Sequence, residues 1–117
     1  FGASAVLLFA APTAVLSQPV NLVGGNIVAC CVALPLAAFW PDHVWVAALA
    51  CGLTISLTVL FRVVHPPAGA TALVIYLTKA SWTFFFVPVL AGSLLLVFIA
   101  WGWHRVMGGI YPLKSPP

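Results

Sequence analysis

The sequence predicts an all-α, polytopic transmembrane domain that contains two short or broken helices. Of its 117 residues, 64% are hydrophobic and only 4% are charged, whereas soluble domains carry about 25% charged residues. Four basic residues and one acid cannot cover a surface that faces water, so the solvent of this fold is lipid. The basic residues are isolated at the ends of apolar segments, which fits anchoring at a membrane interface and argues against nucleic acid as a partner.

Five apolar segments, separated by turn residues, define the expected elements. We expect helices within residues 2–16, 22–40, 44–64, 67–78 and 84–103. The first and the fourth are short for a membrane span of about 20 residues. Tryptophans flank the turn at residues 41–43 and both ends of the last segment, as in the aromatic belts of membrane proteins. The tail from Met107 onward holds Gly108, Gly109 and three prolines and is expected to be irregular.

The stretch RVVHPPAGATALVIY, residues 62–76, indicates a broken helix. Pro66 and Pro67 do not fit a helix interior but suit a first turn. One helix should therefore end near Val64 and another begin near Pro67. A helix N-terminus offers unpaired N–H groups and the positive end of a dipole, so the new helix is a candidate site for an anion.

The chain also contains an internal repeat with an offset of 67 positions. GASAVLLF at residues 2–9 matches GATALVIY at residues 69–76, and LVGGN at 22–26 matches VLAGS at 89–93. Each copy reads as a short helix followed by a full span, and a further span should precede Phe1. Secondary transporters often consist of two such repeats with discontinuous helices. Whether the two copies are parallel or inverted stays open at this point.

Two charged or titratable residues and two hydroxyls are the candidates for function. Arg62 and His65 either extend to the headgroup region or attract and gate an anion, in which case His65 can also exchange a proton. Ser4 and Thr71 occupy matching places in the repeat, where a hydroxyl either replaces a water of hydration or bonds back to the preceding turn. Gly2 and Gly69 suit a helix crossing or an ion path.

The remaining polar residues have simpler interpretations. Gln18, Asn21 and Asn26 are expected to form interhelical hydrogen bonds, since amides in lipid need partners; lining a polar pathway is the alternative. His43 and His104 lie at segment ends and are expected at the interface. Small residues at every fourth position of the third segment suggest a close helix contact; they are Ala48, Gly52 and Ser56.

The residue types argue against an enzyme. The three cysteines lack the spacing of a zinc site and are interpreted as small packing residues. The three histidines have no metal-ligand spacing, and Asp42 is the one carboxylate, so paired-carboxylate catalysis is excluded. We therefore expect no catalytic residues, no metal and no cofactor.

The block from Val64 to Leu73, VHPPAGATAL, resembles the signature of the HPP family of integral membrane proteins. The resemblance extends to FGASAVLLF at the start of the chain, to Gln18-Pro19 and to Asn21 and Gly24-Gly25. It implies a polytopic helical domain over residues 1–112, with 113–117 as an irregular tail. Some members in cyanobacteria and chloroplasts are linked to nitrite transport, so a bacterial inner membrane or a chloroplast envelope is implied. Val20 departs from the family, which often has a basic residue there.

Together these features predict the passage of a small anion, with nitrite as the leading substrate. The expected partners are membrane lipid, the anion and a second copy of the chain in a homo-oligomer. The alternative is a membrane scaffold that transports nothing and anchors a partner or an oligomer. The residues assigned to substrate binding are Gly2, Ser4, Arg62, His65, Pro66, Pro67, Gly69 and Thr71.

Overall fold

The computed structural model describes residues 1–114, and these form an all-helical fold with no strand. The α-helices are α1 (Gly2–Ala10), α2 (Pro19–Phe39), α3 (Val44–Leu60), α4 (Pro67–Leu77) and α5 (Ala91–Val106). A 3₁₀ turn at Val15–Ser17 precedes α2. A 3₁₀ turn at Trp82–Phe85 and a π-helical turn at Phe86–Leu90 lead directly into α5. The predicted fold class is therefore confirmed.

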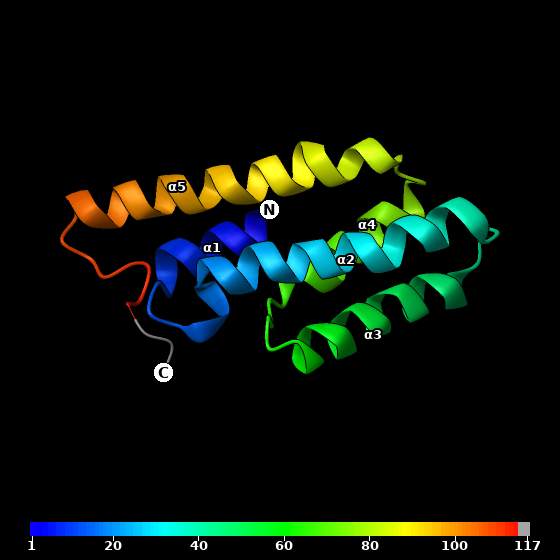
Figure 1. The fold of residues 1–117 in the computed structure, drawn as a ribbon, viewed down its shortest axis with the longest axis horizontal. Coiled ribbons are helices and arrows are strands. Elements are labelled where there is room, and N and C mark those ends of the chain that lie inside the picture. The colour runs from blue at the N-terminus through cyan, green and yellow to red at the C-terminus, as the bar shows by residue number, and fades with distance from the viewer. Residues whose placement is uncertain (115–117) are drawn as a thin grey trace.

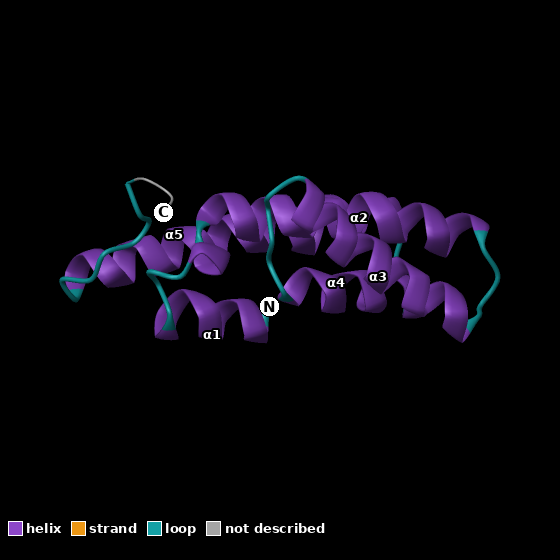
Figure 2. Ribbon diagram, turned by 90° about the horizontal axis from the view of Figure 1, so that it is seen from below, coloured by secondary structure: helices purple, strands orange, loops and turns teal. Residues whose placement is uncertain are grey.

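Two long helices and two short ones run along the same axis of the molecule. Helices α2 and α5 run in opposite directions along its 49 Å length, and α3 lies beside α2. The short helices α1 and α4 lie end to end, with their N-termini near the middle of the long axis (Figures 1 and 2). From there α1 runs toward one end of the molecule and α4 toward the other.

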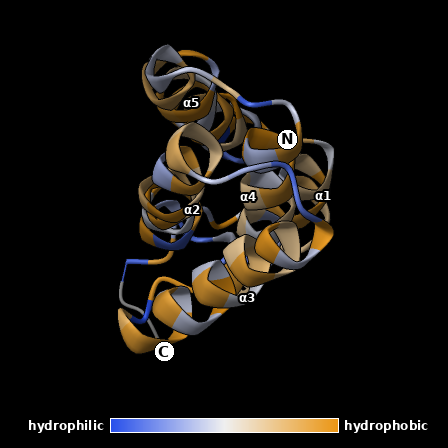
Figure 3. Cartoon of the chain, turned by 90° about the vertical axis from the view of Figure 1, so that its right-hand side faces the viewer, coloured by the Kyte–Doolittle hydropathy of each residue, from blue (hydrophilic) through white to orange (hydrophobic). Residues whose placement is uncertain are grey.

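Two stretches are long and apolar enough to cross a membrane, namely Pro19–Phe39 with 21 residues and Trp82–Val106 with 25. At about 1.5 Å per residue, each exceeds the hydrocarbon thickness of about 30 Å. The helices also expose large apolar side chains, such as Val20, Phe98 and Val106. In Figure 3 hydrophobic ribbon predominates on the helices, and hydrophilic ribbon is concentrated in the connecting segments.

The first helix is shorter than the sequence pattern suggested, because a proline interrupts it. Helix α1 ends at Ala10 rather than continuing to Leu16, and Ala11 has a non-helical conformation (φ −137°, ψ 57°). Pro12 lacks an N–H and disfavours a helical conformation at the residue before it. The second helix starts earlier than predicted, with Pro19 at its first turn.

Helix α3 ends at Leu60 instead of near Val64, because the chain closes it with a Schellman motif. Arg62 has a left-handed backbone (φ 56°), its N–H donates to Val59 O (3.1 Å), and Val63 N–H donates to Thr58 O (2.9 Å). This is the usual hydrogen-bond pattern of a helix C-terminus, although glycine normally occupies the left-handed position. The following helix begins at Pro67, as predicted.

The interior consists of two apolar clusters with a polar layer between them. Along α2, Leu22 belongs to one cluster and Ala29 to the other, and the buried Asn26 lies between them. Along α5 the buried Ser93 likewise follows Val89 of one cluster and precedes Ala100 of the other. The polar layer therefore crosses the molecule at the level where the two short helices begin.

The small residues proposed as the contact face of α3 are not the ones that pack. Ala48, Gly52 and Ser56 are all exposed. The buried face of α3 is formed instead by Ala47, Ala50, Thr54 and Thr58. This face is offset from the predicted one because Gly69 of α4 lies against Cys51 and Ile55 of α3.

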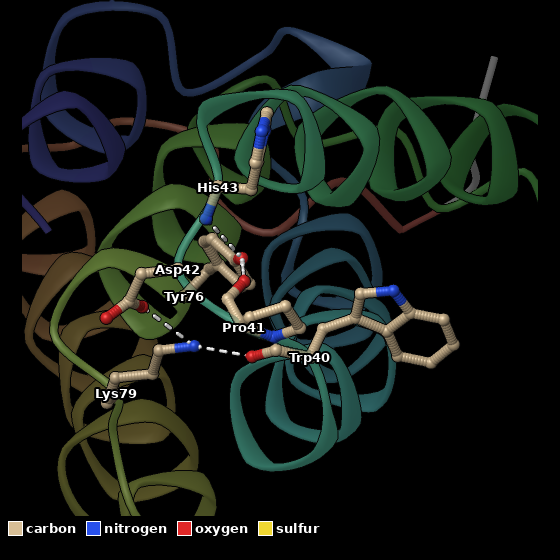
Figure 4. Close-up of polar contacts among 6 residues, drawn as sticks. All are labelled: Trp40, Pro41, Asp42, His43, Tyr76 and Lys79. Carbon is tan, nitrogen blue, oxygen red and sulfur yellow. Dashed lines mark hydrogen bonds and ion pairs between the residues drawn. The ribbon is translucent and has the colours of Figure 1, made fainter.

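At one end of the molecule, polar contacts join the α2–α3 turn to the end of α4 (Figure 4). Lys79 Nζ forms an ion pair with Asp42 Oδ1 (2.9 Å) and donates to Trp40 O (2.9 Å). Tyr76 OH donates to Pro41 O (2.7 Å) and accepts from His43 N–H (3.2 Å). The exposed Trp40 and His43 lie here, as expected for residues at a water interface.

Candidate functional site

A cavity of about 260 Å³ lies between the first turns of α1 and α4 and the segment that leads into α5. It is smaller than the roughly 300–1,000 Å³ of pockets for drug-sized ligands, but far larger than the about 30 Å³ of one water molecule. The space therefore suits a small solute with some of its water. Its lining residues are Phe1, Ala3, Ser4, Pro67, Ala70, Thr71, Val74, Phe84, Pro88 and Val89.

The electrostatics of this cavity favour a negative charge. Each helix N-terminus carries the equivalent of about +0.5 elementary charge. The first turns of α1 and α4 both line the cavity, and the N-termini of these helices face each other (Figure 2). The acid of this chain, Asp42, lies in the α2–α3 turn and is paired with Lys79. The lining contains no charged side chain, and its polar side chains are the hydroxyls of Ser4 and Thr71.

The start of α4 differs from the sequence interpretation, which assigned it unpaired N–H groups. Pro66 and Pro67 have no N–H to offer. Ala68 N–H donates to His65 O (2.9 Å) and Gly69 N–H to Pro66 O (3.3 Å). Because the chain turns helically before Pro67, its own carbonyls satisfy these donors. Helix α4 therefore contributes a dipole and the Thr71 hydroxyl to the cavity, rather than its first N–H groups.

Ser4 joins the cavity to His65, which lies behind it. Ser4 Oγ is 2.8 Å from His65 Nε2, and His65 Nδ1 is 3.0 Å from Leu16 O. A carbonyl only accepts, so Nδ1 carries the proton in the neutral ring, and Nε2 then accepts from the Ser4 hydroxyl. Ser4 and His65 are only 2% and 1% exposed, so this arrangement is enclosed by protein.

Thr71 belongs to a second polar chain on the opposite wall. Its hydroxyl donates to Asn26 Oδ1 (2.9 Å), with a longer contact to Pro67 O (3.4 Å). Asn26 Nδ2 in turn donates to Ser93 Oγ (3.2 Å). The amide therefore links α2, α4 and α5, which confirms the expected interhelical hydrogen bond for Asn26.

Two adjacent glycines allow the loop that carries His65 to lie directly on α2. A Cβ atom on Gly25 would be 2.8 Å from His65 Cβ and 3.1 Å from Val63 O, and one on Gly24 would be 2.9 Å from Val63 Cγ1. Asn21 Nδ2 donates to Val64 O (3.1 Å) on the same loop. Helix α2 therefore sets the position of the imidazole, although the residues involved are about 40 positions apart in sequence.

Arg62 does not lie at this cavity. Helix α3 ends before it, so Arg62 and His65 do not share a helical face. Arg62 instead lines a separate groove of about 590 Å³, together with residues before and within the first turn of α2 and residues of the C-terminal tail. The structure thus brings Ser4, His65, Pro67 and Thr71 together around one cavity and leaves Arg62 outside it.

The other assigned residues have mainly structural surroundings. Gly69 is buried, and a Cβ there would be 3.3 Å from Cys51 Sγ of α3, so this glycine serves a helix crossing. Gly2 is exposed, and nothing lies within 4 Å of the position that a Cβ would take there. Pro66 is exposed and precedes the first residue of α4.

The sequence interpretation was wrong about His104, which is buried rather than interfacial. Its Nε2 is 2.8 Å from Leu8 O, so the ring donates to a carbonyl of the last turn of α1. Ser17 Oγ donates to Leu7 O (3.1 Å) and Ala11 O (2.7 Å) at the same helix end. The last carbonyls of α1 have no partner within the helix and need donors from elsewhere in the protein. The early end of α1 is therefore the sequence feature that could have indicated the roles of Ser17 and His104.

Comparison with known proteins agrees with this architecture. The family model described as HPP, transmembrane region, matches residues 1–112. A transmembrane protein of Dictyostelium discoideum is 39% identical over 108 residues, which is 86% of this chain and 35% of the relative. A second transmembrane protein of the same organism is 35% identical over 110 residues, 86% of this chain and 38% of that protein.

The chain therefore spans little more than a third of the length of these curated relatives. No solved structure matches it. The match over almost the whole chain, the apolar exterior and the two membrane-length helices lead to one conclusion: this is an integral membrane protein, and the chain belongs to the HPP family of transmembrane domains.

Proposed function

We propose that the protein passes a small monovalent oxyanion across its membrane, with nitrite as the first substrate to test. The observation that carries the proposal is the meeting of two helix N-termini at one cavity that contains no acidic side chain. In a low-dielectric interior two positive helix ends attract an anion strongly. The cavity lies near the middle of the long axis; in this proposal that axis crosses the membrane, so the cavity is where an ion in the hydrocarbon needs stabilisation most.

In this proposal the anion keeps part of its water, and the cavity wall that contains Ser4 and Thr71 takes the place of the rest. Thr71 is fixed by Asn26 and Ser4 by His65. Arg62, which lines the separate groove, acts only through its long-range field. The chemistry is passage and not catalysis, in keeping with an expected absence of cofactors. The bacterial or chloroplast membrane that the family resemblance implies remains a prediction.

We also propose that the two sequence repeats are related by inversion. Helix α1 is antiparallel to α4, and α2 is antiparallel to α5 (Figure 1). The hydrogen-bonded Asn26 and Ser93 are separated by 67 positions, the offset of the repeat. An inverted pair would place equivalent elements on either side of the cavity, an arrangement common among secondary transporters.

The direct test is nitrite entry into liposomes that contain the purified full-length protein. We expect saturable entry above that of empty liposomes, with weaker competition by chloride than by nitrate, because nitrate is also a planar oxyanion. A Ser4→Ala, Thr71→Val double variant should lower entry, whereas the exposed Thr78→Val should not. If liposomes that contain the folded protein took up no more nitrite than empty liposomes, the proposal would be rejected and the scaffold alternative favoured.

Water access separates passage from a scaffold without any assumption about the substrate. Ser4→Cys and Thr71→Cys would be made singly in a protein in which Cys30, Cys31 and Cys51 are replaced by alanine. Passage requires a cavity that water reaches, so both new thiols should react with a small water-soluble thiol reagent. Complete protection of both would favour the scaffold.

A further inference from the structure

The hydrogen bond between Ser4 and His65 determines whether Ser4 can donate to an anion in the cavity. In the neutral ring the Ser4 proton points toward His65 Nε2, since Nδ1 already donates to Leu16 O. Ser4 then presents only oxygen lone pairs to the cavity. An anion receives no hydrogen bond from it in this state, although Ser4 lines the wall.

A second proton on His65 reverses this hydrogen bond. Protonated Nε2 donates to Ser4 Oγ, so the Ser4 hydroxyl becomes the acceptor and its own proton no longer points to His65. That proton becomes available to an acceptor in the cavity. The buried ring then carries a positive charge one hydrogen bond away from the cavity, and an enclosed charge of this kind is costly without a counter-ion.

Within residues 1–114, the surroundings of His65 supply no such counter-ion. Helix α1 presents Ser4, the 3₁₀ turn presents the Leu16 carbonyl, and α2 presents Gly25 and Asn21. None of these groups titrates. The nearest charge along the chain is Arg62, which has the same sign as the imidazolium and opposes protonation. The anion in the cavity is therefore the available partner for the charge.

We propose that His65 and Ser4 form a proton-coupled switch, so that the cavity takes up a small oxyanion together with one proton. The inference rests on the proposed function, because it assigns the regulation of the same cavity. The proton comes from water, binds to His65 Nε2 and leaves when the anion leaves. Coupling is reciprocal: the proton strengthens anion binding, and the anion strengthens proton binding by the same factor.

The matched control is the second buried histidine of the chain. His104 Nε2 also bonds to a backbone carbonyl, that of Leu8, but His104 does not line the cavity. Substitution of His65 by glutamine removes the titrating ring and keeps an amide that can donate to Leu16 O. Substitution of His104 by glutamine makes the same chemical change away from the cavity.

The first readout is the protonation state of His65 in the full-length protein in lipid nanodiscs. Nitrogen-15 NMR of labelled histidine, with His43 and His104 replaced by glutamine, reports the ring tautomer as nitrite is added at several pH values. We expect the Nδ1–H tautomer without nitrite, and protonation with it. The apparent nitrite dissociation constant should rise about tenfold per pH unit above the titration of His65.

Ser4→Ala tests the hydroxyl in the same titration. With His65 protonated, we expect the Ser4→Ala variant to bind nitrite at least about tenfold more weakly than the unchanged protein does, because the variant lacks the hydroxyl that donates to the anion beside a charge. If Ser4 instead turns back to the Phe1 carbonyl, Ser4→Ala will leave that affinity unchanged, and the switch is wrong. The proposed switch would also be overturned if the tautomer and the protonation state of His65 did not change when nitrite is added.

The second readout is proton movement out of nitrite-loaded liposomes as nitrite leaves, followed as internal alkalinisation with a trapped pH dye and corrected for liposomes without protein. We expect protein-dependent nitrite flux with about one proton per anion, retained in His104→Gln and lost in His65→Gln. Nitrite flux without proton movement would reject the switch and keep the proposed function. Nitrite-dependent protonation without flux would keep the switch as a property of a binding site and reject transport.

Discussion

Helices α1 and α4 begin at the same cavity, each with a hydroxyl in its first turns, yet the two hydroxyls have different partners. Ser4 bonds to an imidazole, which can change its charge near neutral pH. Thr71 bonds to the amide of Asn26, which keeps one charge state at every pH. Similar sequence segments can therefore form one wall whose partner titrates and another whose partner does not.

Asn26 and His65 are also held in position by different parts of the fold. Asn26 belongs to the continuous helix α2 and is held by Ser93 of α5. His65 belongs to the non-helical loop between α3 and α4, and close packing on Gly25 holds it. The proton-sensitive wall should therefore be the easier one to displace by a change in packing.

The largest effect is expected for Gly25→Leu, which disrupts the His65 wall. Even the first side-chain atom would be 2.8 Å from His65 Cβ and 3.1 Å from Val63 O, so the loop must move. Overpacking typically costs about 1–3 kcal/mol and occasionally more, and the clash with a backbone atom as well as a side chain puts this variant at or above the upper end of that range. Thermal unfolding in detergent, followed by tryptophan fluorescence, should show a lower midpoint. Gly52→Leu is the control, because nothing lies within 4 Å of its Cβ position; equal midpoints would contradict the close approach.

Asn26→Leu should disrupt the opposite wall by a smaller amount. The change leaves the Thr71 hydroxyl and the buried Ser93 without their shared partner, at a cost of about 1–3 kcal/mol in unfolding free energy. Replacing all three groups with apolar ones, as Asn26→Leu, Thr71→Val and Ser93→Ala, should recover much of the loss. Stability that falls further in the triple variant would argue against this network.

Thr71→Val and Ser4→Ala should differ in how their transport depends on pH. The Thr71 hydroxyl proton is donated to Asn26 Oδ1, so its loss releases the amide that orders this wall of the cavity. Loss of that hydrogen bond of about 1 kcal/mol should lower nitrite uptake about fivefold, and by the same factor in acid and alkaline buffer. Ser4→Ala should lower uptake mainly in acid buffer. Liposome uptake at the two pH values measures both, with Thr71→Ser as the variant that keeps the hydroxyl. A pH-dependent defect in Thr71→Val would remove the distinction between the walls.

The smallest effect concerns the helix end that precedes the His65 loop. Arg62 has a left-handed backbone, which costs a non-glycine residue about 1–2 kcal/mol. Arg62→Gly should therefore be more stable than Arg62→Ala by about 1 kcal/mol, since both remove the charge and only glycine removes the strain. Equilibrium unfolding of the two variants tests this, and the reverse order would contradict the Schellman motif.

Sequence patterns predicted the helices best where a residue's own chemistry sets the structure. Pro66 and Pro67 marked the start of α4 because proline suits a first turn, and the apolar runs marked the long spans. Pro12 offered an equally direct signal for the end of α1. The end of α3 was harder to predict, because Arg62 occupies a position that glycine usually marks; Lys79 does the same at the end of α4.

Long-range contacts were the part that sequence patterns could not supply. His65 and Ser4 were both assigned to the site, but their hydrogen bond depends on how the loop packs on Gly24 and Gly25 of another helix. Arg62 was assigned to the same site because it is close to His65 in sequence, and the turn after α3 separates them. His104 looked interfacial because polar residues at segment ends usually are, and its buried carbonyl partner comes from α1.

In the proposed transport function, the end-to-end placement of α1 and α4 would also change the energy that an anion needs to cross the membrane. A helix that crossed without a break would leave its positive end in water, where solvent screens it. Two half-helices that start in the interior instead place both positive ends where the local dielectric constant is low and Coulomb interactions are strong. The slab of hydrocarbon opposes an ion most at its midplane, and in the proposed transport function the two helix ends would set an electrostatic well for the anion at about that depth.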